Sequence, residues 1–304
     1  MTQAAEQTDT AQAKPDWTTR PIKGAFGLEI IGLNLATATA TQAGAVEQLF
    51  NRHGALLFRG QDLAPQDLVA FSRHFGALDE APVNEEGKTA IDGLPELYVV
   101  SNIKGSDGKA LGSLGAGEAV WHTDMSYLET PPKASMLYAL EIPAEGGNTW
   151  LADMYAALAD MPADLRARIE GRRIKHDGTF NSAGLLRQGL TECHDPRASV
   201  GTYHPIICTH EDTGKEVLYL GRRRNAYVEG LDLEASETLL DDLWAHAAQP
   251  AFAYEHSWRV GDVLMWDNRA TLHRRDPFDP EARRYMLRTQ IKSTAAPRMS
   301  APAG

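Results

Sequence analysis

Residues 135–142, with the sequence SMLYALEI, form an apolar run of β-strand length near the middle of the chain. Similar runs recur along the sequence, each bounded by turn residues, which is the pattern of a mainly β protein. The other runs after Trp121 are NTWLAD (148–153), YHPIICTH (203–210), EVLYL (216–220), DVLMWD (262–267) and RYMLRTQIK (284–292). Two earlier runs, ALLFRG (55–60) and LYVVSN (97–102), extend the pattern towards the N-terminus.

Helical patterns interrupt these strands. They lie at residues 42–53 and 65–75, within MYAALADMPADLRARIEG (154–171), which suggests two short helices, and in DLEASETLLDDLWAHAA (232–248). The last of these is strongly amphipathic, with apolar residues on one stripe. Since no internal repeat or long linker is present, the sequence predicts a mainly β fold with α insertions (α+β). We expect a double-stranded β-helix, or jelly roll, flanked by helices.

The chain has 304 residues, of which 43% are hydrophobic, enough for one large domain. Residues 1–16 are rich in Ala, Gln and Thr and predict a disordered tail. We expect a single domain over residues 17–297 and a C-terminal tail over residues 298–304. The polar, glycine-rich segment 81–119 is interpreted as a lid over a site.

The charge balance bears on the partners of the protein. The 30 basic and 41 acidic residues give a net charge of -11, which opposes binding to nucleic acid or to an anionic membrane. A small-molecule partner is the better expectation. The chain has neither an apolar run of spanning length nor a signal-peptide pattern, and its two cysteines, Cys193 and Cys208, read as free thiols. These features predict a cytoplasmic protein.

The segment WHTDMSY (121–127) carries the first chemical signal. His122 and Asp124 are two residues apart, and in a strand they would share a face. A third ligand is His273 in WDNRATLHRRD, after an apolar strand and a tight turn. Two histidines and one carboxylate on one face of a metal are typical of non-haem Fe(II) oxygenases. A catalytic zinc site stays an alternative, although the helical HExxH motif is absent.

A second H-x-D pair, His210 and Asp212, shows that this spacing alone is weak. The pair lies beside Thr213 and Gly214 between two predicted strands, where a polar hairpin turn is expected. We therefore interpret this pair as structural.

The segment ARRYMLRTQIK (282–292) predicts a strand with arginines on one face. In that strand Arg284 and Arg288 lie on the same side. A guanidinium that faces the interior needs an anionic partner, and it pairs with a carboxylate in a planar fork. The segment therefore indicates a dicarboxylate or another anionic ligand.

Together these segments resemble the Fe(II)- and 2-oxoglutarate-dependent dioxygenases of the taurine dioxygenase and 2,4-dichlorophenoxyacetate dioxygenase type. The resemblance covers residues 22–291. It rests on four segments that occur in the family's order: WHTDMSYLETPP, GGNTWLADMYAA, WDNRATLH and RRYMLRTQ.

The resemblance implies a cofactor set and the residues that hold it. It implies that His122, Asp124 and His273 bind Fe(II). It also implies that Thr149 and Arg284 hold the distal carboxylate of 2-oxoglutarate. With O2 as the second cosubstrate, the implied reaction hydroxylates a substrate and releases succinate and CO2.

For the substrate, the resemblance implies that Arg288 binds a sulfonate or carboxylate of a small organic compound, aryloxyalkanoates included. Taurine itself is not expected, because the segment FGALDEAPVNEE (75–86) lacks the histidine that helps to hold the sulfonate in taurine dioxygenase. The alternatives are the same chemistry on a neutral biosynthetic intermediate, a zinc hydrolase, and a metal-binding jelly-roll protein without oxygenase activity. Relatives commonly form dimers or tetramers, so we expect a homo-oligomer.

Overall fold

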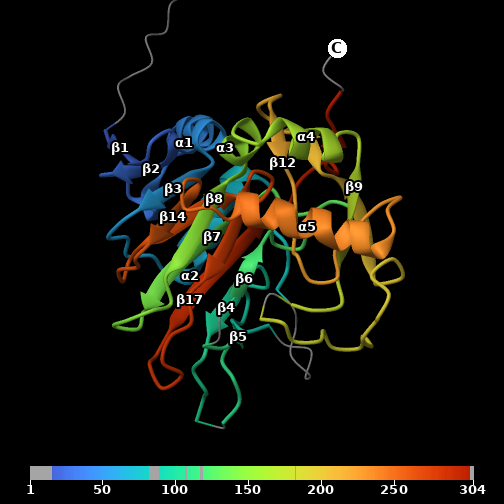
Figure 1. The fold of residues 1–304 in the computed structure, drawn as a ribbon. Coiled ribbons are helices and arrows are strands. Elements are labelled where there is room, and N and C mark those ends of the chain that lie inside the picture. The colour runs from blue at the N-terminus through green and yellow to red at the C-terminus, as the bar shows by residue number, and fades with distance from the viewer. Residues whose placement is uncertain (1–15, 82–88, 107, 117–118, 182, 302–304) are drawn as a thin grey trace, which may run out of the picture.

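A computed structural model describes residues 16–81, 89–106, 108–116, 119–181 and 183–301, and these form mostly strands with helices between them (Figure 1). The largest sheet has the strand order β1-β2-β3-β15-β7-β17-β4-β5. Its strands are β1 (Thr18–Lys23), β2 (Phe26–Ile31), β3 (Ala55–Phe58), β4 (Tyr98–Ser101), β5 (Ser113–Leu114), β7 (Ala134–Glu141), β15 (Val263–Asp267) and β17 (Tyr285–Ile291). β7 pairs antiparallel with both β15 and β17, so three of the predicted strands meet at the centre of this sheet.

A smaller sheet has the order β14-β8-β16-β6. Its strands are β6 (Ala119–His122), β8 (Thr149–Asp153), β14 (Ala253–His256) and β16 (Thr271–Arg275). One cluster of buried side chains joins the two sheets, with Leu137, Leu264 and Met286 from the large sheet and Leu151 from the small one. The two sheets therefore pack against each other through their apolar faces.

Two further sheets extend the fold. They have the orders β10-β9-β13 and β12-β11-β18. Their strands are β9 (Arg173–Asp177), β10 (Gly201–Pro205), β11 (Ile207–Thr209), β12 (Glu216–Leu218), β13 (Tyr227–Val228) and β18 (Arg298–Met299).

The helices fall into two groups that pack in different apolar clusters, and α5 of the second group crosses the front of the view in Figure 1. The first group is η1 (Leu35–Thr37), α1 (Ala40–His53), α2 (Pro65–Ser72) and η2 (Arg73–Phe75). Phe50 of α1 and Phe71 of α2 pack with Phe58 and Met136 of the large sheet. The second group is α3 (Met154–Ala159), α4 (Ala163–Ile169) and α5 (Leu233–Ala247). Residues of these three helices share one buried apolar cluster with residues of β11 and β12.

Local sequence explains why α1 begins and ends where it does. Thr39 accepts a hydrogen bond from the backbone N–H of Gln42, whose side chain accepts one from the backbone N–H of Thr39. This reciprocal cap satisfies two amide groups that the first turn would leave without partners. Gly54 ends the helix in the left-handed region at φ 71°, which glycine adopts without strain.

The predicted class, mainly β with helical insertions, is confirmed, and several boundaries are corrected. Residues 203–210 form two strands, β10 and β11, which belong to different sheets. The C-terminal tail predicted from residue 298 begins instead with β18, which pairs with β11. The predicted N-terminal tail lies outside the described residues except for Asp16, and the predicted lid at 81–119 lies partly outside them.

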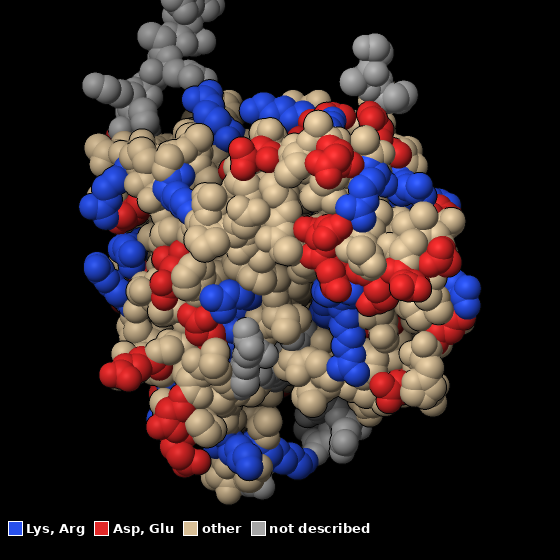
Figure 2. Space-filling view, viewed as in Figure 1, with Lys and Arg blue, Asp and Glu red and all other residues tan. Residues whose placement is uncertain are grey.

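Both cysteines are free, as predicted. No helix in the described part of the chain has the length and apolar character needed to cross a membrane. Figure 2 shows acidic and basic side chains interspersed over the face it draws. Many of them pair locally, as Arg223 does with Glu237 and Asp241 of α5, so the surface fits a protein whose partner is a small molecule.

The packing between the two sheets predicts where a substitution costs most. Leu264 of β15 is fully buried in the cluster that joins the sheets. We expect Leu264→Ala to lower the free energy of unfolding by about 2–5 kcal/mol, because it removes buried surface and leaves a cavity. Val260→Ala, at a residue that is 60% exposed, should change it by less than about 0.5 kcal/mol. Urea denaturation measures both, and equal losses would contradict this view of the core.

Candidate active site

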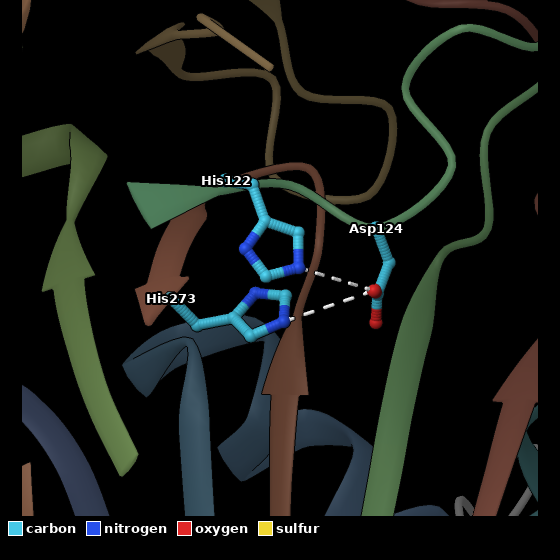
Figure 3. Close-up of side chains that lie close together, drawn as sticks. All are labelled: His122, Asp124 and His273. Atoms are coloured by element: carbon cyan, nitrogen blue, oxygen red, sulfur yellow. Dashed lines mark ion pairs between the residues drawn. The ribbon is translucent and has the colours of Figure 1, made fainter. Parts of the chain in front are cut away.

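Three predicted ligands, His122, Asp124 and His273, converge at one end of the small sheet (Figure 3). His122 ends β6 and is the direct pairing partner of His273 in β16, and the two rings lie 4.1 Å apart. Oδ1 of Asp124 lies 3.6 Å from Nε2 of His122 and 3.7 Å from Nε2 of His273. One ligand atom from each residue therefore falls within 4.8 Å of the other two, and all three residues are buried.

The local structure around Asp124 corrects one expectation. β6 ends at His122, so Asp124 does not share a strand face with it. Asp124 lies instead in the turn that follows, where Met125 adopts a positive φ of 47°. The backbone N–H of Thr123 donates to the carbonyl of Gly221 at 3.0 Å and anchors this turn. Tertiary contact, and not strand alternation, thus brings the carboxylate to the histidines.

The protonation states suit metal binding. Nδ1 of His122 lies 2.7 Å from the carbonyl oxygen of Val120 and donates to it, which directs Nε2 towards the site. Burial, followed by the neighbouring His122, holds the pKa of His273 well below its usual value. Burial alone would raise the pKa of Asp124, but the charge of Arg288, followed by contact with the two histidines, holds it well below its usual range. Neutral imidazoles and an ionised carboxylate are the forms that bind a cation.

A chain of buried hydrogen bonds fixes the other carboxylate oxygen, and sequence reasoning missed it. The hydroxyl of Ser135 donates to Oδ2 of Asp124 at 2.9 Å and accepts from Nδ2 of Asn268 at 3.0 Å. Nε1 of Trp266 in turn donates to Oδ1 of Asn268 at 3.0 Å. This chain leaves Oδ1 of Asp124 to face the two histidines. Partners of this kind orient the ligands of metal sites.

A cavity of about 50 Å³ opens beside the histidines, and the other predicted site residues line it. Its lining consists of Val100, Ala119, His122, Leu137, Thr149, Trp266, His273, Arg274, Arg275, Arg284 and Arg288. The structure thus brings Thr149, Arg284 and Arg288 to the same cavity as the two histidines.

Arg284 and Thr149 have the properties expected of an anion site. Arg284 is almost fully buried, and its Nε and Nη1 atoms have no hydrogen-bond partner among the described residues. Burial, followed by the charge of Arg275, lowers its pKa to about 9. The hydroxyl oxygen of Thr149 accepts from Nε1 of Trp258 at 3.1 Å, which leaves its hydrogen to donate elsewhere. A carboxylate would satisfy both residues.

Two glycines allow close packing in the turn before Thr149. A Cβ at Gly146 would lie 2.5 Å from the carbonyl oxygen of Pro277, and a Cβ at Gly147 would lie 3.1 Å from Cγ of Pro143. Both have positive φ, at 74° and 66°. The segment GGNT therefore uses glycines for close packing as well as for the turn that leads to Thr149.

Arg288 lies on the Asp124 side of the cavity. Its Nη1 is 3.4 Å from both carboxylate oxygens of Asp124, and its guanidinium carbon lies 4.9 Å from the centre of the Tyr98 ring. Its side chain keeps 14% of its surface exposed, so it is more accessible than Arg284.

The second H-x-D pair does not join this site. His210 accepts hydrogen bonds at Nδ1 from the backbone N–H groups of Asp212 and Thr213, and its Nε2 donates to Asp267 at 3.0 Å. It thus stabilises the turn between β11 and β12, as predicted.

Comparison with known proteins agrees with this geometry. The model of the family described as "Taurine catabolism dioxygenase TauD, TfdA family" matches residues 18–290. An alpha-ketoglutarate-dependent 2,4-dichlorophenoxyacetate dioxygenase of Cupriavidus pinatubonensis is 36% identical over 87% of this chain and 93% of its own. A pentalenolactone F synthase of Streptomyces avermitilis is 29% identical over 88% of this chain and 91% of its own. Among solved structures, AAD-2 in complex with Mn(II) and N-oxalylglycine has a TM-score of 0.74 at 28% identity, over 92% of this chain and 98% of that one.

The chain belongs to the taurine catabolism dioxygenase TauD, TfdA family. It is a 2-oxoglutarate-dependent non-haem iron dioxygenase, with Fe(II), 2-oxoglutarate and O2 as its cofactor and cosubstrates. Its side chains fit that set, because two imidazoles and a carboxylate suit Fe(II), and a buried arginine with two nitrogens unpaired among the described residues suits a carboxylate.

The hydrogen bond from Ser135 to Asp124 predicts an effect on the metal. We expect Ser135→Ala to weaken Fe(II) affinity about tenfold, because the carboxylate loses the donor that holds its second oxygen. Ser72→Ala is a matched control, since Ser72 is equally buried and hydrogen-bonded but lies away from the site, next to Thr289. Anaerobic titration with Fe(II) measures both variants. Equal affinities in the two variants would show that Ser135 does not position the ligand.

Proposed function

We propose that His122, Asp124 and His273 hold the Fe(II), and that the cavity beside them binds 2-oxoglutarate. The observation that carries this proposal is the position of Arg284 and Thr149, a buried cation and a hydroxyl donor in one cavity with two of the candidate ligands. In this arrangement Arg284 and Thr149 would hold the distal carboxylate of the keto acid, and its other end would lie towards His122, Asp124 and His273. We also propose that the two packed sheets form a double-stranded β-helix.

The residues of the chain bind and orient, while the bound iron, 2-oxoglutarate and O2 supply the oxidation and yield succinate and CO2. Asp124 and the two histidines occupy one side of the metal and leave the other side to the cosubstrates. Arg284 and Thr149 fix the distal carboxylate and thereby the direction in which the keto acid lies. The apolar lining, with Val100, Leu137 and Trp266, excludes water from the reacting groups.

For the primary substrate we propose a small organic anion, a carboxylate or sulfonate, that Arg288 binds. Arg288 keeps 14% of its side-chain surface exposed and lies next to Asp124 and to the ring of Tyr98. A cation beside an aromatic ring suits an aryloxyalkanoate, which carries both an acid group and a ring. The 2,4-dichlorophenoxyacetate dioxygenase relative agrees with this class.

The same chemistry on a neutral biosynthetic intermediate is the second candidate. The pentalenolactone F synthase relative agrees with a biosynthetic role, because its name describes the formation of a compound. We further propose a homo-oligomeric enzyme, a dimer or tetramer, in the cytoplasm, a location that agrees with its two free thiols.

Anaerobic titration of the apoprotein with Fe(II) and 2-oxoglutarate tests the cofactor site. A visible metal-to-ligand charge-transfer band should appear, because it requires the keto acid to chelate the iron. His122→Ala should abolish it by removing a ligand, whereas His210→Ala, at a histidine outside the site, should retain it. Fe(II) binding without a band in the unaltered protein would overturn the proposed cosubstrate site.

Replacement of Arg288 separates the two substrate classes. With an anionic substrate, we expect Arg288→Gln to weaken substrate affinity more than tenfold, about 1.4 kcal/mol, because a charge-assisted contact is lost. Substrate candidates are found first by a screen of carboxylates and sulfonates for succinate release. Since Arg288 also contacts Asp124, the affinities for Fe(II) and 2-oxoglutarate are measured in parallel. An unchanged substrate affinity would favour the neutral intermediate.

A further inference from the structure

Strand β16 brings a second side chain to the cavity beside His273. Alternate residues of a strand face the same side, so Arg275 shares the face of His273, two positions further along. Arg275 is only 6% exposed and lines the cavity together with His273. Its neighbour Arg274 has its guanidinium 4.6 Å from the centre of the Trp150 ring and donates to Asp276.

The position of Arg275 coincides with the end of the cavity assigned to the distal carboxylate. Its backbone pairs with that of Thr149 on β8. The guanidinium carbons of Arg275 and Arg284 lie 5.6 Å and 5.9 Å from the centre of one ring, that of Phe278. Two guanidinium groups and a threonine thus come together at this end.

The charge of the cavity points the same way. Of the four arginines that line it, Arg274 donates to Asp276 and Arg288 contacts Asp124, while Arg275 and Arg284 lie against the same ring. Like charges held close together in a buried place repel each other, and an anion between them removes that repulsion. A carboxylate has two oxygens with about four acceptor positions, so it can accept from two guanidinium groups and a hydroxyl at once.

We propose that Arg275 is a second cationic anchor for the distal carboxylate of 2-oxoglutarate, beside Arg284 and Thr149. The inference rests on the proposed function, in which this cavity holds the cosubstrate. With Arg275 in this role, the end of the cavity is a site for a carboxylate and not for an alkyl group. The enzyme therefore selects 2-oxo acids that carry a second acid group.

The test compares two keto acids on the Fe(II)-loaded enzyme without O2. 2-Oxopentanoate chelates a metal as 2-oxoglutarate does but has a methyl group in place of the distal carboxylate. In Arg275→Met, the charge-transfer titration should show 2-oxoglutarate binding at least about tenfold weaker, the size expected for one lost contact between charged groups. The dissociation constant of 2-oxopentanoate, measured directly or by competition, should change by less than about threefold.

Two matched variants and two further measurements exclude a general structural effect. Arg283→Met removes the arginine that precedes Arg284 in the sequence and pairs with Glu141 at the surface. This variant should leave both dissociation constants unchanged. Arg275→Lys, which keeps the charge but loses the planar fork, should restore part of the affinity for 2-oxoglutarate. The midpoint of thermal unfolding and the Fe(II) affinity of each variant show whether fold and metal site are retained.

The outcomes are distinguishable. A dissociation constant for 2-oxoglutarate within about twofold of the unaltered enzyme, or an equal loss for both keto acids, would overturn the role of Arg275. Absence of the charge-transfer band in the unaltered enzyme would instead overturn the proposed cosubstrate site. A selective loss for 2-oxoglutarate in Arg275→Met supports both.

Discussion

The antiparallel pairing of β16 with β6 and β8 is the constraint on which the site depends. It sets His273 opposite His122 and Arg275 opposite Thr149. One short strand thereby contributes a metal ligand and a cation to the same cavity. A shift of one residue in this pairing would turn both side chains to the other face of the sheet. The face of β16 opposite His273 carries Leu272, which is fully buried in an apolar cluster with residues of α5, and this packing holds the register.

Stability and chemistry draw on different parts of the molecule. Two large apolar clusters, built around α1 and α2 on one side and around α5 on the other, lie apart from the cavity. The apolar surface buried in these clusters stabilises the fold. It offsets the free-energy cost of burying charged groups at the site, such as Asp124 and Arg284. The hydrogen bond from Ser135 and the contact with Arg288 offset part of the cost of burying the Asp124 carboxylate. Arg284 has a less complete set of protein partners, which is the condition expected of a residue that binds a ligand.

The sequence predicted apolar strands such as β7 and β15 but missed β2 (FGLEII), and it also missed strands whose chemistry is polar. β7 and β15 were recognisable, whereas β9 (RIKHD) and β16 (TLHRR) carry charged side chains that are buried in the folded protein. The residues of the candidate site could be predicted because they recur at fixed places in recognisable motifs. The hydrogen bond between Ser135 and Asn268 joins residues 133 positions apart, so it depends on tertiary structure that no local pattern encodes. Arg275 was within reach of strand alternation from His273, had β16 been recognised as a strand.

The choice of arginine at position 288 follows from the two tasks that the proposed function gives it. Its Nη1 already lies within 3.4 Å of the Asp124 carboxylate, so it contributes to keeping that ligand ionised. A guanidinium has five N–H donors in a plane, and contact with Asp124 leaves others to face an anionic substrate. Lysine would concentrate its charge at one point and lack this fork. In the proposed function the same group stabilises the metal ligand and binds the substrate, so the acid group of the substrate would lie close to the metal.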